Sequence, residues 1–212
     1  MKRFFKLILC SIIVSTVFVF GLTGCSDGVE TMEVGTVENA DFQYSINKIV
    51  DEEGNTIDHF AKVTKYIGDE DLVNVPAQVY YAELSEEINV TSIGSLAFYD
   101  LPVKNVVLAE GITIIENFSF GYSEIMTIDI PSTIESIGDW SFVNCMGFRE
   151  IIIRAETSPE LGIYAFKYYD EDGSKDYEID PELKIKVPSL EAYQTEDVLN
   201  NWIEYQDNLE EV

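Results

Sequence analysis

The sequence is poor in the side chains on which most catalytic sites depend. Its 212 residues include one histidine and three cysteines. A serine or cysteine hydrolase usually needs a histidine base, and a structural zinc site needs a cluster of histidines and cysteines. The chain also lacks a glycine-rich phosphate loop and a nucleophile elbow. We therefore expect the chain not to be an enzyme, and we expect the one histidine, His59, to be a surface residue.

Basic side chains are also scarce. Lysine and arginine number 13 against 39 aspartates and glutamates, which gives a net charge of −26. A field of this sign repels the phosphates of nucleic acids and anionic lipid headgroups, so nucleic acid is not an expected partner. The acidity favours a cationic partner or divalent cations. Alternatively, it serves only to keep an extracellular protein soluble.

The longest apolar run is short for a transmembrane helix. Lys2, Arg3 and Lys6 precede a mostly apolar stretch of roughly 16 residues at 7–22, whereas about 20 are needed to span a bilayer. A basic start, a short apolar stretch and small residues before a cleavage point are typical of a signal peptide, here residues 1–24. An uncleaved membrane helix is the alternative. Both interpretations place the rest of the chain outside the cytoplasm.

The end of this run, Leu22-Thr23-Gly24-Cys25, resembles the lipobox of bacterial lipoproteins. The resemblance implies that Cys25 is diacylated and becomes the new N-terminus, so the diacylglycerol and acyl lipid on Cys25 are the only attached groups that we expect. Two acyl chains give stable membrane anchoring. Removal of residues 1–24 takes away three positive charges and no negative ones, so the mature net charge is −29. Cys145 then remains as the single free thiol, and the core must hold the fold without a disulfide.

A repeat of 22 residues runs through the middle of the chain. The segment Val90-Thr-Ser-Ile-Gly-Ser-Leu-Ala-Phe98 recurs at 112–120 and at 134–142, and a shortened copy lies at 162–166. Pairs of apolar residues at period 2 lie between and around the copies, as expected for short strands with one buried face. These pairs are Val73/Val75, Val106/Leu108, Ile128/Ile130, Ile151/Ile153 and Ile185/Val187.

Repeats of this kind stack, because no single coil can bury its own apolar face. We therefore predict an α/β solenoid of about five parallel strands. The Ala/Ser-Phe pair of each repeat is expected on a turn of helix opposite the strand. The rings that should share one column between the coils are Phe98, Phe120, Phe142 and Phe166.

The pattern Ile-x-x-Ile-Gly-x-x-Ala-Phe, followed by Asn144-Cys145 and a strand ending in Ile-Pro, resembles the BspA-like (Treponema pallidum-type) leucine-rich repeats of bacterial surface proteins. The stretch 185–193, with Trp202 and Tyr205, is similar to the usual ending of that family. The resemblance covers roughly residues 60–212. It implies attachment or recognition, commonly of host or matrix proteins, and it brings no catalytic residues. It also implies a buried apolar role for Cys145. Many members of the family have more repeats than this chain.

The expected domain order follows from these segments. It is a signal peptide at 1–24, a lipidated flexible tether at 25–40, an N-terminal β-hairpin cap at 41–70, the leucine-rich-repeat solenoid at 71–188 and a C-terminal helical cap at 189–212. The hairpin is indicated by alternating apolar residues and a turn at 53–55. The last segment carries one apolar stripe on a helix, which is either a cap or a free partner-binding helix. The residues of that stripe are Val198, Trp202, Tyr205 and Leu209.

Two insertions, at 80–89 and 167–180, lengthen the first and last coils. Loops on a rigid scaffold often carry recognition. The second insertion could gather oxygen ligands for calcium, but it lacks the order of an EF-hand loop. A solvated acidic loop is the alternative, and we predict no other metal site. The acids concerned are Asp170, Asp172, Asp176 and Asp180.

Strand residues between the buried ones are expected to face outward on a concave sheet. They mix apolar and charged groups, as a recognition surface can, although an ordinary solvent-facing sheet has the same pattern. Tyrosines at loops (Tyr80, Tyr81, Tyr99, Tyr122, Tyr168 and Tyr169) could add contact anchors or pack between coils. The candidate binding residues are Asn74, Asn105, Val107, Thr127, Asp129, Glu150, Ile152, Lys184 and Lys186, with Leu72 beside them.

The sequence thus predicts a lipoprotein anchored to the cell membrane at the bacterial surface, whose sheet and loops bind a protein or a glycan. The alternative is a structural or assembly partner of another envelope protein, with no soluble ligand. The tether at 26–40 spans at most ~50 Å, which favours a partner close to the membrane. Paired carboxylates are compatible with a glycosidase, but so short a solenoid offers no deep cleft. The oligomeric state is not determined by the sequence.

Overall fold

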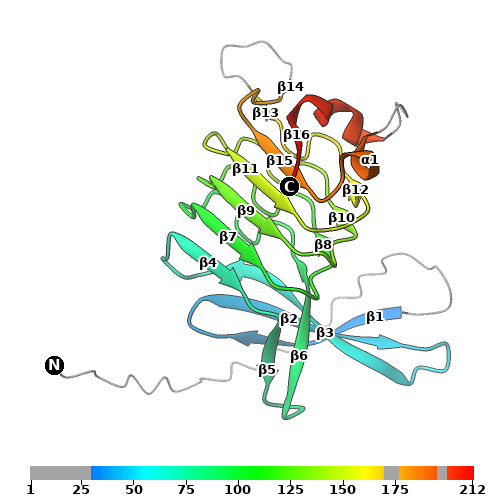
Figure 1. Ribbon diagram of the computed structural model, residues 1–212. Helices are drawn as coiled ribbons and strands as arrows, with labels where there is room; N and C mark the ends of the chain where they lie inside the picture. Colours follow the sequence, from blue (N-terminus) through cyan, green and yellow to red (C-terminus); the bar gives the residue numbers. More distant parts are fainter. Residues whose placement is uncertain (1–29, 170–176, 195–199) are drawn as a thin grey trace.

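The computed structural model describes residues 30–169, 177–194 and 200–212 (Figure 1). Two sheets dominate this part of the chain. The back sheet runs in the order β1 (Glu30–Glu38), β2 (Phe42–Val50), β3 (Thr56–Tyr66), β6 (Glu86–Ile93), β8 (Ile114–Ile115), β10 (Ser136–Ile137) and β12 (Glu160–Leu161), with β5 (Gln78–Tyr81) paired to β6. The front sheet runs in the order β16 (Leu209–Glu211), β15 (Lys184–Val187), β11 (Glu150–Ile153), β9 (Thr127–Ile130), β7 (Asn105–Leu108) and β4 (Leu72–Val75).

Successive repeats add one strand to each sheet. One repeat contributes β7 to the front sheet and β8 to the back sheet, the next contributes β9 and β10, and the third contributes β11 and β12. Each of these strands is hydrogen-bonded in parallel to its equivalent in the next coil. The front strands are the five that the apolar pairs predicted, together with β16, which was not expected. Buried Ile, Val and Leu side chains from both sheets fill the space between them. The coils therefore bury together the apolar faces that none could bury alone.

Rings from successive repeats form one buried column. Phe98 stacks on Phe120 with ring centroids 4.7 Å apart, and Phe120 stacks on Phe142 at 4.8 Å. Phe166 continues the column at 5.5 Å from Phe142. Tyr66 of β3 closes one end, at 5.4 Å from Phe98. The column that the repeat predicted is present, so the repeats are equivalent coils of a single stack.

The turns that carry these rings are not helical, which corrects the predicted turn of helix. The residue before each Ala or Ser has left-handed backbone, with φ between 54° and 63° at Leu96, Phe118, Trp140 and Tyr164. Left-handed backbone breaks a helix and costs a non-glycine residue roughly 1–2 kcal/mol. The amide of Phe120 donates instead to the carbonyl of Ser141 in the next coil, at 2.8 Å. The turn thus combines hydrogen bonds to the next coil with bonds between residues three apart, such as the one from the amide of Gly121 to the carbonyl of Phe118, and forms no helix.

Helices are confined to the C-terminal end in the described parts of the chain. They are α1 (Leu190–Tyr193) and the 3₁₀ helix η1 (Asn201–Asn208). The predicted single helix with four apolar residues is wrong, because Leu209 begins β16 and pairs with Ile185. Trp202 and Tyr205 are buried against Phe166, at ring distances of 6.3 and 5.3 Å. Val198 lies outside the described residues.

The expected hairpin at 41–70 corresponds to β2 and β3. The preceding residues 30–38, expected to belong to a flexible tether, form β1 and pair antiparallel with β2. Most side chains of β1 are exposed on both faces, so its sequence carries no alternating pattern that predicts a strand. Backbone pairing holds it instead, and Tyr81 packs so closely against Gly35 that a Cβ there would lie 2.2 Å from the hydroxyl.

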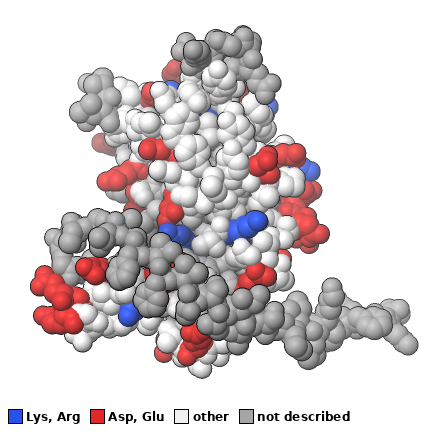
Figure 2. All heavy atoms as spheres, turned by 180° about the vertical axis from the view of Figure 1, so that it is seen from behind, with Lys and Arg blue, Asp and Glu red and all other residues white. Residues whose placement is uncertain are grey.

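Charged side chains are unevenly spread over the surface. Viewed from behind, acidic side chains gather along the margins of the repeat stack and at the outer end of strands β1, β2 and β3, here called the N-terminal sheet (Figure 2). Between these margins the upper part of the stack is largely uncharged, and basic side chains lie near the centre of the view. None of the described residues forms a helix long and apolar enough to span a bilayer.

Adjacent isoleucines on β8 give a matched test of the core. The side chain of Ile115 is fully buried, with 0% exposed, whereas that of Ile114 is 41% exposed. We expect Ile115→Ala to lower the free energy of unfolding by about 2–5 kcal/mol, because it leaves a cavity between the coils. Ile114→Ala should cost less than about 1 kcal/mol. Urea unfolding measures both, and equal losses would contradict the burial described here.

One carboxylate joins the N-terminal sheet to the repeats. Glu116 accepts a hydrogen bond from Lys62 of β3 at 2.6 Å, and from the amide and hydroxyl of Ser95 at 2.9 and 3.2 Å. Burial raises the pKa of Glu116, but the hydrogen bonds from Lys62 and Ser95 outweigh it and the net shift is downward. The ionised form is therefore the one that stabilises the fold.

The pH dependence of Glu116→Gln tests this link. A depressed pKa stabilises the folded state above the unfolded value of about 4.3, and this is lost as the pH falls through the folded value. We expect the variant to be less stable than the wild type by about 0.5–1 kcal/mol at pH 7, and the difference to shrink below about pH 4.5. Glu124→Gln, at an exposed carboxylate of the same coil, is the control. A loss independent of pH would count against the charged link.

Candidate functional site

Outward side chains of the front sheet form two straight rows. Parallel pairing keeps β4, β7, β9, β11 and β15 in register, so equivalent residues lie side by side. One row consists of Leu72, Asn105, Thr127, Glu150 and Lys184, and the other of Asn74, Val107, Asp129, Ile152 and Lys186. The structure therefore brings all nine predicted binding residues to one face.

The charged residues of this face neutralise one another. Asp129 accepts hydrogen bonds from Nε and Nη2 of Arg154 at 2.7 and 2.6 Å. Hydrogen bonding to Asp129 raises the pKa of Arg154, so the pair stays ionised. The other ion pairs of the face are Lys186–Glu150 at 2.6 Å and Lys184–Glu210 at 2.7 Å. The face thus presents paired charges with apolar side chains among them and has no strong field of one sign.

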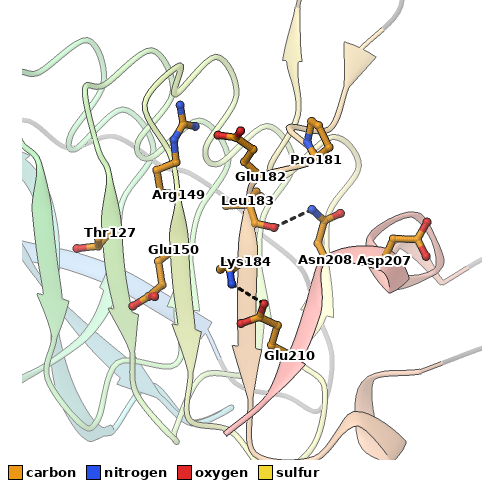
Figure 3. A pocket seen from close by; sticks show the side chains of 10 residues that line it. All are labelled: Thr127, Arg149, Glu150, Pro181, Glu182, Leu183, Lys184, Asp207, Asn208 and Glu210. Atoms are coloured by element: carbon orange, nitrogen blue, oxygen red, sulfur yellow. Dashed lines mark hydrogen bonds and ion pairs between the residues drawn. The ribbon is translucent and has the colours of Figure 1, made fainter.

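A shallow pocket of about 590 Å³ opens where β11 and β15 begin (Figure 3). Lys184 points toward Glu210 at its side, and the amide of Asn208 donates to the carbonyl of Leu183 at 2.8 Å. Its lining residues are Thr127, Arg149, Glu150, Pro181, Glu182, Leu183, Lys184, Asp207, Asn208 and Glu210. This lining can hydrogen-bond polar groups of a partner, but it contains neither a histidine nor a thiol.

The calcium candidates do not form a site in the described residues. Asp170, Asp172 and Asp176 lie outside them. Asp180 accepts a hydrogen bond from Arg149 at 2.6 Å and another from the amide of Glu182 at 2.8 Å. In residues 30–169, 177–194 and 200–212, no three acids, histidines or cysteines are arranged to hold a metal ion. The ion pair with Arg149 accounts for Asp180 without a cation.

Cys145 and His59, a thiol and an imidazole of the kinds used in nucleophilic catalysis, lie in different parts of the fold. Cys145 is buried and its thiol donates to the carbonyl of Phe120 at 3.2 Å. Burial raises the pKa of Cys145 to about 12, so the thiol stays protonated at neutral pH. His59 lies on β3 opposite Lys48. Cys145 thus occupies the buried position that the family resemblance implied.

Three aromatic residues on the turns of the stack are not among the predicted contact residues. Phe118, Trp140 and Tyr164 occupy the left-handed position of successive turns. Phe118 stacks on Trp140 at 5.9 Å, and Tyr164 lies tilted against Trp140 at 4.7 Å. The sequence signal for them is an aromatic residue that recurs directly before each of the last three Ser-Phe or Ala-Phe pairs. Of the tyrosines predicted as contact anchors, Tyr81 is buried, whereas Tyr80, Tyr99 and Tyr122 are exposed.

Comparison with known proteins supports the repeat and the fold. Residues 78–174 match the family described as "BspA type Leucine rich repeat region", in six copies. No curated protein matches the sequence. A leucine-rich repeat protein from Bacteroides capillosus has a similar structure, with 17% identity and a TM-score of 0.53, over 73% of this chain and 99% of that one.

Two other solved structures are more distant. A leucine-rich repeat protein from Bacteroides ovatus is 20% identical over 71% of this chain and 37% of that one, with a TM-score of 0.46. A leucine rich cell surface protein from Faecalibacterium prausnitzii is 14% identical over 74% and 56% of the two chains, with a TM-score of 0.30. The family match names a repeat region and no catalytic family. The repeats of this chain are therefore leucine-rich repeats of the BspA type, on a leucine-rich-repeat fold.

Proposed function

We propose that the protein is an extracytoplasmic lipoprotein whose front sheet binds a protein or a glycan. The observation that carries this proposal is the two-row array of outward side chains, contributed in register by five consecutive strands. A rigid, continuous face with apolar residues between paired charges suits recognition, because its side chains are ordered before a partner arrives. BspA-type repeats suggest an interaction module, and proteins that carry them are typically exposed at the bacterial surface.

The position of β1 favours a second candidate, in which the domain packs on another envelope protein. If Cys25 is acylated, only residues 26–29 separate the lipid from the first residue of β1. Five residue steps span at most roughly 18 Å, well below the ~50 Å of the expected tether. The N-terminal sheet would then lie close to the membrane surface, and a partner within the envelope would be easier to reach than a distant matrix.

The lipid anchor is tested by replacing Cys25. We expect the wild-type protein to partition into detergent and to incorporate labelled palmitate in the cell, and Cys25→Ser to do neither. Cys10→Ser, which changes a cysteine within the predicted signal peptide, is the matched control and should behave as the wild type. Membrane association that persists in Cys25→Ser would refute the anchor.

The binding face is tested by site-specific cross-linking on intact cells. A photoreactive amino acid at Val107, on the front sheet, should yield a discrete cross-linked species, whereas one at Ile57, an exposed apolar residue of β3, should not. Asp129→Lys beside Val107 should abolish that species, because it repels Arg154 and disturbs the neighbouring row. Equal cross-linking from both positions would argue against a specific front-sheet partner.

Protease added to intact cells separates the two candidates. A domain that is cut by external protease supports binding of an external protein or glycan. A domain that is protected until the envelope is opened supports the envelope partner. The cross-linked mass from Val107 then identifies whether that partner is a protein.

A further inference from the structure

The back sheet ends in a strand whose outer edge is open. β1 is the first strand in the order of that sheet, and in residues 30–169, 177–194 and 200–212 it pairs with β2 alone (Figure 1). Its nine residues make it longer than every strand of the front sheet. At the opposite end of the back sheet, β12 has only two residues, and Asn201 donates to the carbonyl of Leu161 there at 2.7 Å. An open edge of this length is a template for a further strand.

The hydrogen bonds of β1 show which of its backbone groups point away from β2. The amide of Asn39 donates to the carbonyl of Phe42 at 2.9 Å, so this pair begins the ladder between the two strands. Only every second pair of an antiparallel ladder is hydrogen-bonded, and the next such pair is Val37 with Tyr44. The residues between the bonded pairs, on both sides of the bulge at 33–35, therefore turn their N–H and C=O groups outward. They are Thr31, Glu33, Thr36 and Glu38.

The open edge is fixed in its extended form by the rest of the fold. The buried ring of Tyr81 packs against Gly35, and its hydroxyl donates to Glu83 at 2.6 Å. Val37 packs against the core. A strand that is already ordered loses little conformational freedom when a partner binds. The edge of β1 is therefore suited to recognition by strand addition, in which backbone hydrogen bonds supply affinity and side chains supply specificity.

Carboxylates line the open edge. Glu33 and Glu38 extend from the same face of β1, because residues with outward backbone groups share one face of a strand. These two and Glu30 form no ion pair within the parts of the chain that the structure describes. The basic residue of β2, Lys48, lies opposite Met32 on the other face. An added strand would meet negative charge on one face and the 38% exposed side chain of Met32 on the other.

We propose that the open edge of β1 binds an extended segment of another protein in which basic and apolar residues alternate. The basic side chains would lie opposite Glu33 and Glu38, where a cross-strand pair of opposite charge stabilises a sheet. A second copy of this chain fits less well, because it brings its own glutamates to the same edge and a net charge of −26. The site is separate from the front sheet and depends neither on it nor on the lipid anchor.

The pairing is tested by binding of the full chain, in nonionic detergent, to a fluorescent nonapeptide of alternating lysine and valine. N-methyl groups on the lysine amides block the edge that should face β1, and N-methyl groups on the valine amides block the other edge. The lysine-methylated peptide should bind at least about tenfold more weakly than the unmodified one, because it loses several backbone hydrogen bonds. The valine-methylated peptide should bind as the unmodified one does. Equal affinity of the two methylated peptides, or no saturable binding of the unmodified one, would overturn the proposal.

Charge reversal tests the choice of partner. The double variant Glu33→Lys and Glu38→Lys should bind the lysine-valine peptide at least about tenfold more weakly and should gain affinity for a glutamate-valine peptide. Glu52→Lys with Glu53→Lys, at exposed residues after β2, changes the net charge equally and is the matched control. It should alter both affinities less than about twofold at physiological salt. Equal losses in the two double variants would show attraction by net charge alone and would also overturn the proposal. If the first variant does not fold, the methylated peptides with the wild type remain decisive.

Discussion

The structure depends on one contact that is repeated from coil to coil. The amide of an aromatic residue donates to the carbonyl of the small residue in the next coil, while its ring stacks on the next ring. The donors Tyr66, Phe98, Phe120 and Phe142 bond to Ala97, Ser119, Ser141 and Ala165 at 2.7–2.8 Å. The backbone amide of Phe166, the last residue of the column, donates to the hydroxyl of Tyr205 at 3.3 Å. One line of hydrogen bonds and rings thus runs from the N-terminal sheet to the C-terminal elements, and it satisfies buried amides that a turn would otherwise leave without partners.

This contact explains features that seem unrelated in the sequence. The acceptor must be small, because the backbones of adjacent coils approach closely, and Ala97, Ser119 and Ser141 are fully buried. The close approach of adjacent coils also explains the glycine of the repeat. A Cβ at Gly138 would lie 2.5 Å from the side chain of Asn117 in the preceding coil. Left-handed backbone directs one large side chain outward just before the next ring turns inward. A single turn geometry therefore places one ring in the core and the large side chain two residues before it on the other side of the turn.

The repeat period predicted the elements whose burial alternates. Val106, Ile128 and Ile151 have the spacing of half-buried strands, and they lie in register on the front sheet. The same pattern could not reveal β1, whose side chains are exposed, or β16, which has only three residues. Helical turns were expected at the Ala/Ser-Phe pairs because short apolar spacings fit both a helix and a tight turn. The charge pairs of the candidate site link residues that are far apart in sequence, such as Lys186 and Glu150, so only the fold revealed them.

The strand at the C-terminal edge of the front sheet has a consequence for self-assembly. Glu210 and Glu211 of β16 are engaged with Lys184 and with the amide of Leu190, and they place acidic groups along this edge. A repeated stack exposes unpaired backbone at its ends, and such ends invite copies to add head to tail into fibres. Here β16 pairs in parallel with β15, and Glu210 and Glu211 bond to groups of the same chain. The backbone of β15, which would otherwise be the open edge of the repeat strands, is thus paired within the same chain.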